Sequence, residues 1–469
     1  MRAGNLAYTE EGVEQKMHIH EIVQAQRDYF LAGRTRSYAF RRETLQRMRR
    51  YILKREADIL SALKADLNKP EYEGYMTETG IALNELEHAA RRLKKWMRPV
   101  KARTPMAQFP AKSLIIPEPY GVALIMSPWN YPFQLSVTPL IGAIAAGNCA
   151  VVKPSAYAPH TSRIIAELIG ECFAPEHITA VEGGRGENSA LLEERFDYIF
   201  FTGGISVGKK VMEAAARSLT PLSLELGGKS PCIVWADADI DSAARRIAFG
   251  KCLNAGQTCV APDYLLVHER VKDALISSIS AAFRDFFSGA YEEMPVIIND
   301  RHFERLQNLM RGERIVFGGS CDRERRFIEP TILDNPSWES PVMNEEIFGP
   351  ILPVIAFSDL DEAIKTVRSR PKPLALYLFT RDKKIEQKAL DEISFGGGCV
   401  NDTVMHLATP YMGFGGVGES GMGSYHGKKS FDTFTHYKSM LIRRNRFDWP
   451  LRYRPYTEGK LKWLRRFMG

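Results

Sequence analysis

The stretch that decides the fold is residues 198–209, which read Tyr-Ile-Phe-Phe-Thr-Gly-Gly-Ile-Ser-Val-Gly-Lys. A short apolar run is followed by two glycines and then by the start of a helical pattern. This order predicts a buried strand, a tight turn and a helix. Glycine lets the backbone approach a ligand closely, and a helix N-terminus offers free N–H groups to a phosphate. Residues 198–209 therefore predict a strand–turn–helix unit that suits a pyrophosphate.

The same alternation of apolar runs and helical patterns extends on both sides of this unit. The predicted strands are residues 122–126, 149–152, 178–181, 198–201, 232–235 and 264–267, and the predicted intervening helices are residues 161–173, 207–219, 240–253 and 271–287. Such alternation predicts parallel α/β sheets with right-handed crossovers. Ahead of this region, residues 39–67 and 78–97 have apolar residues at helical spacing among many charges, which predicts amphipathic packing helices.

The composition indicates a globular protein without structural disulfides or metal. The chain has 469 residues, of which 45% are apolar, enough for two or three domains. Its seven cysteines show no paired ligand spacing, so we expect reduced thiols, a cytoplasmic location and no metal site. The His18-x-His20 pair is expected at the surface. No apolar run is long enough to span a bilayer, and residues 1–16, which lack an apolar signal core, are expected to be a poorly ordered leader.

The positive charge of the chain is concentrated in its tail. The net charge is +7, yet residues 438–469 contain ten Lys or Arg against two Asp or Glu. The rest of the chain, ahead of residue 438, is close to neutral, which argues against nucleic-acid binding. Residues 441–469 form a basic amphipathic tail, in which apolar side chains alternate with basic ones near the end: Leu461, Trp463, Leu464, Phe467 and Met468. Three interpretations remain open for it: contact with an anionic membrane surface, a cap over a substrate funnel, and a frayed or dimer-packed end.

Two further segments carry residues suited to covalent catalysis. Cys259 lies in Asn-Ala-Gly-Gln-Thr-Cys-Val-Ala-Pro (residues 254–262), and Glu225 lies in Leu-Glu-Leu-Gly-Gly-Lys-Ser-Pro (residues 224–231). A thiol can attack a carbonyl carbon, and a carboxylate among apolar neighbours has a raised pKa that suits a general base. The glycine-dense segment 413–418 is as consistent with a structural loop as with a binding loop.

Both catalytic segments resemble the active-site signatures of the aldehyde dehydrogenase superfamily, and the resemblance runs from about residue 23 to residue 436. It implies that Cys259 is the nucleophile and Glu225 the base that activates water. Asn130, in Ser-Pro-Trp-Asn-Tyr-Pro (residues 127–132), would supply its side-chain amide to an oxyanion hole, together with the backbone N–H of Cys259. The residues around Ser230 and Val260 and the stretch 421–431 resemble the class 3 branch, which contains fatty and aromatic aldehyde dehydrogenases.

The resemblance also implies a binding site for NAD or NADP. The residues it assigns to the cofactor are Trp129, Lys153, Gly203, Gly204, Gly208, Leu226, Glu346 and Phe348. Many relatives have Gly-Ser-Thr where this chain has Gly203-Gly204-Ile205, so phosphate binding here relies more on the backbone. Ala156 stands where many NAD-preferring relatives have a glutamate that binds the ribose. We therefore hypothesise that NADP⁺ is accepted alongside NAD⁺.

The expected fold is the aldehyde dehydrogenase-like α/β fold in three parts. Residues 17–98 and 120–226 would form a Rossmann-like NAD(P)-binding domain, residues 227–406 an α/β catalytic domain, and residues 99–119 and 407–440 a bridging oligomerisation element. The branch implies homodimers and aldehydes that are medium- or long-chain aliphatic, or aromatic. Two rivals remain, an acylating enzyme that uses coenzyme A and a non-enzymatic binding protein on the same fold.

Overall fold

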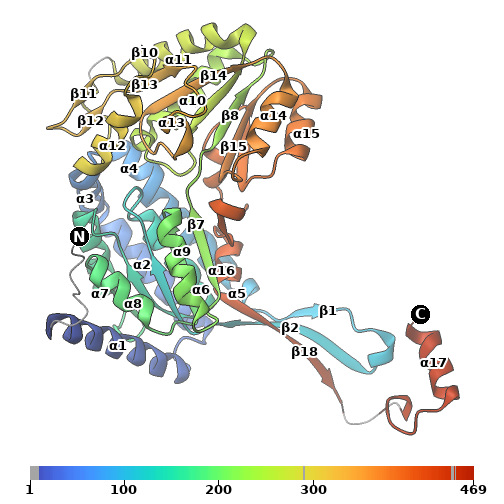
Figure 1. Cartoon of the computed structure of the whole chain (residues 1–469). Coiled ribbons are helices and arrows are strands. Elements are labelled where there is room, and N and C mark those ends of the chain that lie inside the picture. Colours follow the sequence, from blue (N-terminus) through green and yellow to red (C-terminus); the bar gives the residue numbers. More distant parts are fainter. Residues whose placement is uncertain (1–9, 289–290, 445–447, 449, 469) are drawn as a thin grey trace.

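The computed structural model describes residues 10–288, 291–444, 448 and 450–468. Two stacked bodies and a projecting arm make up the molecule (Figure 1). The lower body is built on a six-stranded sheet in the order β17-β7-β6-β3-β4-β5, in which only β17 is antiparallel. Its strands are β3 (Val122–Met126), β4 (Cys149–Lys153), β5 (Ile178–Ala180), β6 (Tyr198–Gly203), β7 (Leu222–Leu226) and β17 (Gly421–Met422).

Helices cover both faces of this sheet because alternate strand residues point to opposite sides. Leu124 packs in the apolar cluster that includes Val23 of α1, whereas its neighbour Ile125 packs in the cluster that includes Leu140 of α6. The helices of the lower body are α1 (Glu10–Leu31), α2 (Tyr38–Lys54), α3 (Glu56–Leu67), α4 (Glu71–Gly74), α5 (Gly80–Trp96), α6 (Gln134–Ala146), α7 (Pro159–Cys172), α8 (Arg185–Glu193), α9 (Ile205–Ala216) and α16 (Lys428–Thr433).

The upper body contains a seven-stranded sheet in the order β10-β13-β14-β9-β8-β15-β16, parallel except for β10. Its strands are β8 (Pro231–Val234), β9 (Tyr264–His268), β10 (Ile315–Phe317), β13 (Thr331–Asp334), β14 (Ile351–Phe357), β15 (Ala375–Phe379) and β16 (Gly397–Val400), beside the small pair β11 (Cys321–Asp322) and β12 (Phe327–Ile328). Its helices are α10 (Ile240–Cys252), α11 (Lys272–Phe287), α12 (Asp300–Met310), α13 (Pro341–Asn344), α14 (Leu360–Arg368) and α15 (Lys383–Glu392). The predicted parallel α/β class is confirmed.

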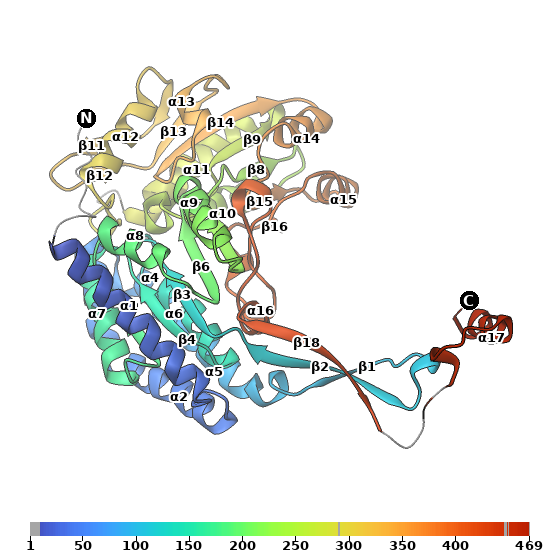
Figure 2. The same ribbon diagram turned by 60° about the horizontal axis from the view of Figure 1, so that its bottom comes forward.

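The arm is a three-stranded antiparallel sheet that leaves the lower body (Figure 2). It consists of β1 (Val100–Ala102), β2 (Ala111–Pro119) and β18 (Thr435–Arg443). Strands β2 and β18 pair along their whole length, from Thr435 opposite Pro119 to Arg443 opposite Ala111. Helix α17 (Glu458–Met468) lies at the tip of the arm, against the short 3-10 helix Met106–Gln108.

Three local expectations need correction. The helical region 39–67 is two helices, because Arg55 leaves the helical conformation and binds Asp58, Glu167 and Glu171. The helix expected from residue 78 starts at Gly80, after a π-helical turn over Tyr75–Thr79. Of the predicted disordered leader, residues 1–9 lie outside the described residues, whereas residues 10–16 belong to α1.

Candidate active site

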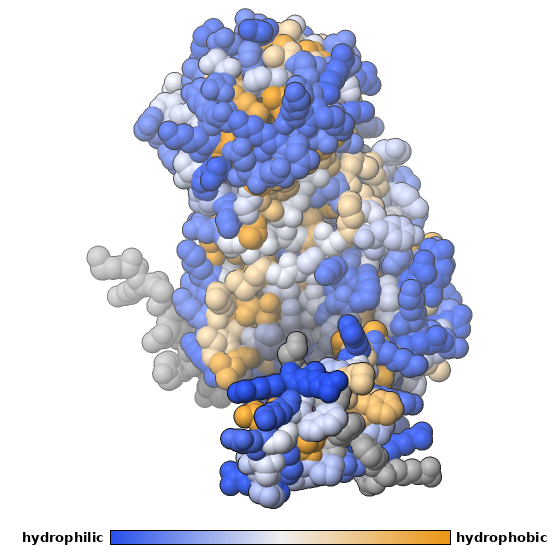
Figure 3. Space-filling view, turned by 90° about the vertical axis from the view of Figure 1, so that its right-hand side faces the viewer, coloured by the Kyte–Doolittle hydropathy of each residue, from blue (hydrophilic) through white to orange (hydrophobic). Residues whose placement is uncertain are grey.

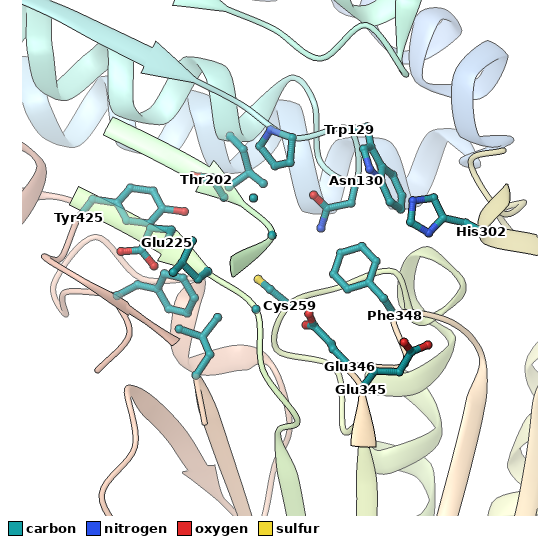
Figure 4. A pocket seen from close by; sticks show the side chains of 18 of the residues that line it. Trp129, Asn130, Thr202, Glu225, Cys259, His302, Glu345, Glu346, Phe348 and Tyr425 are labelled. Atoms are coloured by element: carbon teal, nitrogen blue, oxygen red, sulfur yellow. The ribbon is translucent and has the colours of Figure 1, made fainter. Parts of the chain in front are cut away.

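Cys259 follows a left-handed turn at the junction of the two bodies. Asn254, Ala255 and Gly256 have φ values of 51°, 53° and 71°. This conformation is unfavourable for residues with a Cβ atom and persists where the surroundings hold it. At Gly256 a side chain is also excluded, because a Cβ atom would collide with the carbonyl oxygen of Gly349. The turn directs Cys259 toward the end of β7, which carries Glu225 (Figure 4).

Cys259 lines two cavities. The larger, about 400 Å³, is bordered by nine of the eleven site residues predicted from sequence: Trp129, Asn130, Gly203, Gly204, Glu225, Leu226, Cys259, Glu346 and Phe348. The smaller, about 60 Å³, is bordered mainly by apolar side chains, including Ile81, Leu253 and Leu407. Leu135, Phe414 and Tyr425 border both cavities. The sulfur therefore lies where a space that contains several polar and ionisable groups meets a smaller space with almost wholly apolar walls.

The thiol of Cys259 is neutral at rest. Burial, and then the nearby carboxylates of Glu346 and Glu225, raise its pKa to about 12. A thiol is a weak nucleophile until it loses its proton. The site therefore has to lower the energy of the charge that develops when the sulfur attacks.

Glu225 is a buried carboxyl whose two oxygens have no hydrogen-bond partner among the described residues. Burial raises its pKa well above the usual range, as expected for a carboxyl held among apolar atoms. A Cβ atom on Gly415 would lie 3.1 Å from Glu225 Oε1, so the glycine-dense segment 413–418 makes room for this side chain. In Figure 4 the carboxylate lies beside Tyr425, with Cys259 between it and Phe348.

Asn130 comes from the loop after β3 and is buried. Its Nδ2 donates to the carbonyl oxygen of Gln257 at 3.0 Å. A side-chain amide nitrogen carries two hydrogens, so one remains available for a second acceptor near Cys259. Asn130 and Cys259, which are predicted to form an oxyanion hole, both border the larger cavity.

The larger cavity also contains groups that suit a dinucleotide. Gly204 caps the N-terminus of α9, and a Cβ atom there would meet nothing within 4 Å, so a phosphate has open access to the backbone. Thr202 Oγ1 and Glu346 Oε1 are buried oxygens without a partner among the described residues, as expected of groups that bind ribose or phosphate. Burial raises the pKa of Glu346 to about 8. These residues fit NAD or NADP.

The remaining two predicted cofactor residues do not border the larger cavity. Lys153 ends β4, and its Nζ donates to the carbonyl oxygens of Pro154 and Gly183 at 2.8 and 2.6 Å. Burial lowers its pKa to about 8. Gly208 lies in the first turns of α9, where a Cβ atom would lie 2.7 Å from Leu226 Cδ2. Gly208 therefore lets α9 pack closely on the end of β7.

Several residues at the site were missed in the sequence. His302 and Arg305 of α12 border the larger cavity, and the His302 ring lies 5.4 Å from that of Trp129. Tyr425 separates the two cavities, and Lys69 lies under the Asn130 loop. His302, Arg305 and Lys69 stand in no motif that marks them, because each reaches the site only through the packing of distant segments. Tyr425 lies in the stretch 421–431, which resembles the class 3 branch, but no role was predicted for it. Among the described residues, no group of three His, Cys, Asp or Glu side chains could hold a metal ion.

Comparisons with known proteins give the family. The model of the aldehyde dehydrogenase family matches residues 8–440. The chain is 49% identical to 4,4'-diaponeurosporen-aldehyde dehydrogenase of Staphylococcus aureus over 444 residues, which are 94% of this chain and 96% of the relative. It is 44% identical to mouse aldehyde dehydrogenase family 3 member A2, covering 94% and 92% of the two chains, and 44% identical to the dog "Aldehyde dehydrogenase, dimeric NADP-preferring", covering 91% and 94%.

A solved structure agrees with this assignment. The substrate-bound Staphylococcus aureus AldH matches with a TM-score of 0.94 and 48% identity, covering 97% of this chain and 99% of that one. The chain therefore belongs to the aldehyde dehydrogenase family. Within it the chain is class 3-like, and it is an NAD(P)-dependent aldehyde dehydrogenase. No helix of the described part of the chain is long and apolar enough to cross a membrane.

Proposed function

We propose that this enzyme oxidises medium- or long-chain aliphatic or aromatic aldehydes to carboxylic acids, with Cys259 as nucleophile and Glu225 as the base for hydrolysis. The observation that carries the proposal is the place of Cys259, at the meeting point of the larger cavity, which contains the groups suited to a dinucleotide, and the smaller apolar cavity. An aldehyde that enters from the apolar side presents its carbonyl carbon to the sulfur, and its chain stays among Ile81, Leu253 and Leu407.

The first half of the reaction adds the thiol across the aldehyde carbonyl. A bond forms between Cys259 Sγ and the carbonyl carbon, and the thiol proton ends on the former carbonyl oxygen. The charge that develops on this oxygen is stabilised by the free Nδ2 hydrogen of Asn130 and the backbone N–H of Cys259. Bound NAD(P)⁺ supplies the hydride acceptor. Transfer of the hydride to that cofactor and release of the hydroxyl proton to water would leave an acyl-thioester on Cys259.

The second half is hydrolysis. Glu225 takes a proton from a water molecule, whose oxygen attacks the thioester carbon, and the carbon–sulfur bond breaks. The proton then returns to the sulfur, which restores the neutral thiol favoured by the buried site. Glu225 also favours hydrolysis over the rival reaction, transfer of the acyl group to coenzyme A, since acylating relatives usually lack this base.

We propose that the enzyme uses both NAD⁺ and NADP⁺ as hydride acceptors. Ala156 is exposed and places no carboxylate near Lys153, so the 2′-phosphate of NADP⁺ meets no repulsion from that position. The dog relative is named as NADP-preferring. The proposal predicts measurable turnover with either cofactor, and a strict requirement for NAD⁺ would contradict it.

The arm is proposed to form a homodimer. Strand β18 is an edge strand of the arm with nine residues, and its exposed apolar side chains are Tyr437, Met440, Leu441 and Ile442. An exposed apolar edge strand presents unpaired backbone groups that are a template for pairing with another chain. The dog relative is named as dimeric. Light scattering should give twice the mass of the chain, and the substitution Leu441→Glu should shift it toward that of a monomer.

Helix α17 is proposed to contact an anionic membrane surface. Its exposed Leu461 and Trp463 stand among Lys460, Lys462 and Arg465, the pattern of a helix that lies in a lipid interface. Figure 3, seen from the side of the arm, shows strongly hydrophilic and hydrophobic surface side by side at its tip. The tip of the arm projects away from both bodies (Figure 1), and none of the described residues of α17 borders either cavity, so α17 does not cap the cavities of its own chain. Removing residues 457–469 should abolish sedimentation with phosphatidylserine vesicles, and unchanged sedimentation would contradict this role.

The main experiment follows NAD(P)H formation at about 340 nm with aldehydes from C2 to C16 and with benzaldehyde, for the wild type and Cys259→Ala. The kcat/KM should rise with chain length because each buried CH₂ group contributes about 0.8 kcal/mol. The variant should show no activity. Activity that survives in Cys259→Ala would overturn the assigned nucleophile, and product analysis with and without coenzyme A separates acid from acyl-CoA.

A further inference from the structure

Three charged side chains lie together beneath the loops that carry Asn130 and Cys259. Lys69, Glu73 and Glu78 come from the segment between α3 and α5, and the proposed reaction uses none of them. The side chains of Lys69 and Glu78 have no exposed surface, and Lys69 Nζ lies 2.6 Å from Glu78 Oε1. A buried ion pair is costly to desolvate and is weak evidence for stability, so its remaining hydrogen bonds indicate its role.

The pair binds the Asn130 loop, residues 127–133, at two places. Lys69 Nζ donates to the backbone carbonyl oxygen of Asn130 at 3.1 Å. Glu78 Oε2 accepts the backbone N–H groups of Phe133 and Gln134 at 3.0 and 2.9 Å, where α6 begins. One ion pair thus fixes the loop at its middle and at the point where α6 begins.

Glu73 binds the turn ahead of Cys259. Its Oε1 accepts the backbone N–H of Asn254 at 2.8 Å, the first of the three left-handed residues. The Asn254 side chain in turn donates to the carbonyl oxygen of Asn130 at 2.8 Å, and Tyr131 Oη lies 2.5 Å from Thr258 Oγ1. The Asn130 loop and the Cys259 turn are therefore joined to each other and to the same three charges.

The segment that carries these charges has an unusual backbone. Glu78 lies in the π-helical turn Tyr75–Thr79, a rare conformation that occurs frequently at functional sites. The two groups to be aligned belong to different bodies, Asn130 to the lower and Cys259 to the upper. No single strand or helix fixes their separation, which leaves this task to contacts between the bodies.

We propose that Lys69, Glu73 and Glu78 are positioning residues that hold the oxyanion-binding groups of Asn130 and Cys259 at a fixed separation. The inference rests on the proposed roles of Asn130 and Cys259. Oxyanion stabilisation depends on donors placed before the reaction begins. Loss of the three contacts should therefore lower the rate of the chemical step and leave cofactor binding nearly unchanged.

The first test is the double substitution Lys69→Met/Glu78→Gln, which removes both charges together so that no unpaired charge stays buried. The amide oxygen that replaces the Glu78 carboxylate can still accept the N–H groups at the start of α6, whereas Asn130 loses its ammonium donor. We expect kcat to fall about 10²-fold, comparable with the loss of an oxyanion-hole donor. The Kd for NAD⁺, from quenching of tryptophan fluorescence, should change less than about twofold. Lys94→Met, at an exposed lysine of α5, is the matched control.

The second test compares two substitutions at Glu73. Glu73→Gln keeps an oxygen that can accept the N–H of Asn254, whereas Glu73→Met removes it. We expect Glu73→Gln to retain kcat within about threefold and Glu73→Met to lose at least about tenfold, at similar melting temperatures and cofactor Kd. Equal kcat values in the two variants, or a wild-type kcat in the Lys69/Glu78 variant, would overturn the inference.

Two reference variants separate this inference from the proposed function. If Cys259→Ala or Asn130→Ala retains full activity, the proposed roles of those residues fail. If both lose activity and the Lys69, Glu73 and Glu78 variants do not, only the positioning role fails.

Discussion

The two cavities that meet at Cys259 differ in chemistry. The larger is bordered by the charged groups Glu225, Glu345, Glu346 and Arg305 and by open backbone at Gly204. The smaller has mostly apolar walls, and Gln134 and His426 are among its few polar side chains. The residues assigned to the chemistry border the larger cavity, whereas the proposed function assigns selection among aldehydes to the smaller one. Substitutions among the catalytic residues of the larger cavity should therefore lower kcat, whereas substitutions in the smaller cavity should raise the KM for long aldehydes.

The largest expected effect is on the polar side, from Glu225→Gln. General-base catalysis contributes about 10²–10⁴ in rate, so kcat should fall by about 10²–10³. Because Glu225 is assigned to hydrolysis, a thioester should accumulate. Rapid mixing should show a burst of one NAD(P)H per site, and mass spectrometry should find the acyl group on Cys259.

Glu345→Gln is the control for this prediction, since Glu345 borders the same cavity but pairs with Arg305. It should leave the kcat close to that of the wild type. A Glu225→Gln enzyme that is slow but forms no acyl adduct would show that the base acts before the thioester forms.

A smaller effect is expected on the apolar side, from Ile81→Phe, which adds volume to a cavity of only about 60 Å³. Displacing one or two CH₂ groups of a long substrate costs about 1–1.5 kcal/mol. The KM for C12–C16 aldehydes should then rise about tenfold, whereas kcat with C2–C4 aldehydes stays unchanged. Leu390→Phe, at an exposed position of α15, is the control. If the KM rose equally for short and long aldehydes in Ile81→Phe, the smaller cavity would not hold the hydrocarbon chain of the substrate.

The difference between the cavities also explains what the sequence could and could not predict. Cys259, Glu225, Glu346 and Gly203 stand in short motifs, so the sequence alone predicts them as site residues, and the structure places all four at the larger cavity. The alternation of strands and helices predicted the parallel sheets. The walls of the apolar side come from distant segments, such as Ile81 and Leu407, whose side chains look like ordinary apolar residues.

The network beneath the site escaped sequence reasoning for a similar reason. Lys69 follows the end of α3 and Glu78 belongs to a π-helical turn, and nothing in the local sequence separates a buried charge from a solvated one. Their partners are more than 50 residues away along the chain. Only the packing of the lower body against the Asn130 loop reveals them.

Beyond the larger cavity, at the end of β4, the substitution Ala156→Glu tests the cofactor preference. A carboxylate close to the 2′-phosphate should weaken NADP⁺ binding about tenfold, roughly 1.4 kcal/mol. NAD⁺ binding should not weaken, because the resemblance implies that a glutamate at this position binds the ribose. In the wild type, burial lowers the pKa of Lys153 to about 8. The protonated form attracts the phosphate, so the Kd for NADP⁺ should increase as the pH rises through about 8, with a smaller change for NAD⁺. The Kd values for NADP⁺ and NAD⁺ can be measured by fluorescence titration at pH 6.5 and 9. If both Kd values change with pH in the same way, Lys153 does not recognise the 2′-phosphate.

The smallest expected effect comes from Glu346, which borders the cavity proposed for the cofactor and influences the thiol of Cys259. Burial raises the pKa of Glu346 to about 8, so above that pH the group is anionic and raises the pKa of Cys259. Glu346→Gln removes this charge, lowers the pKa of Cys259 and increases the thiolate fraction. Alkylation by iodoacetamide at pH 9 should therefore be about threefold faster in the variant. At pH 6.5, where Glu346 is protonated in the wild type, the two rates should agree. If the alkylation rate of Glu346→Gln exceeded that of the wild type by the same factor at both pH values, the substitution would have changed access to the sulfur and not its pKa.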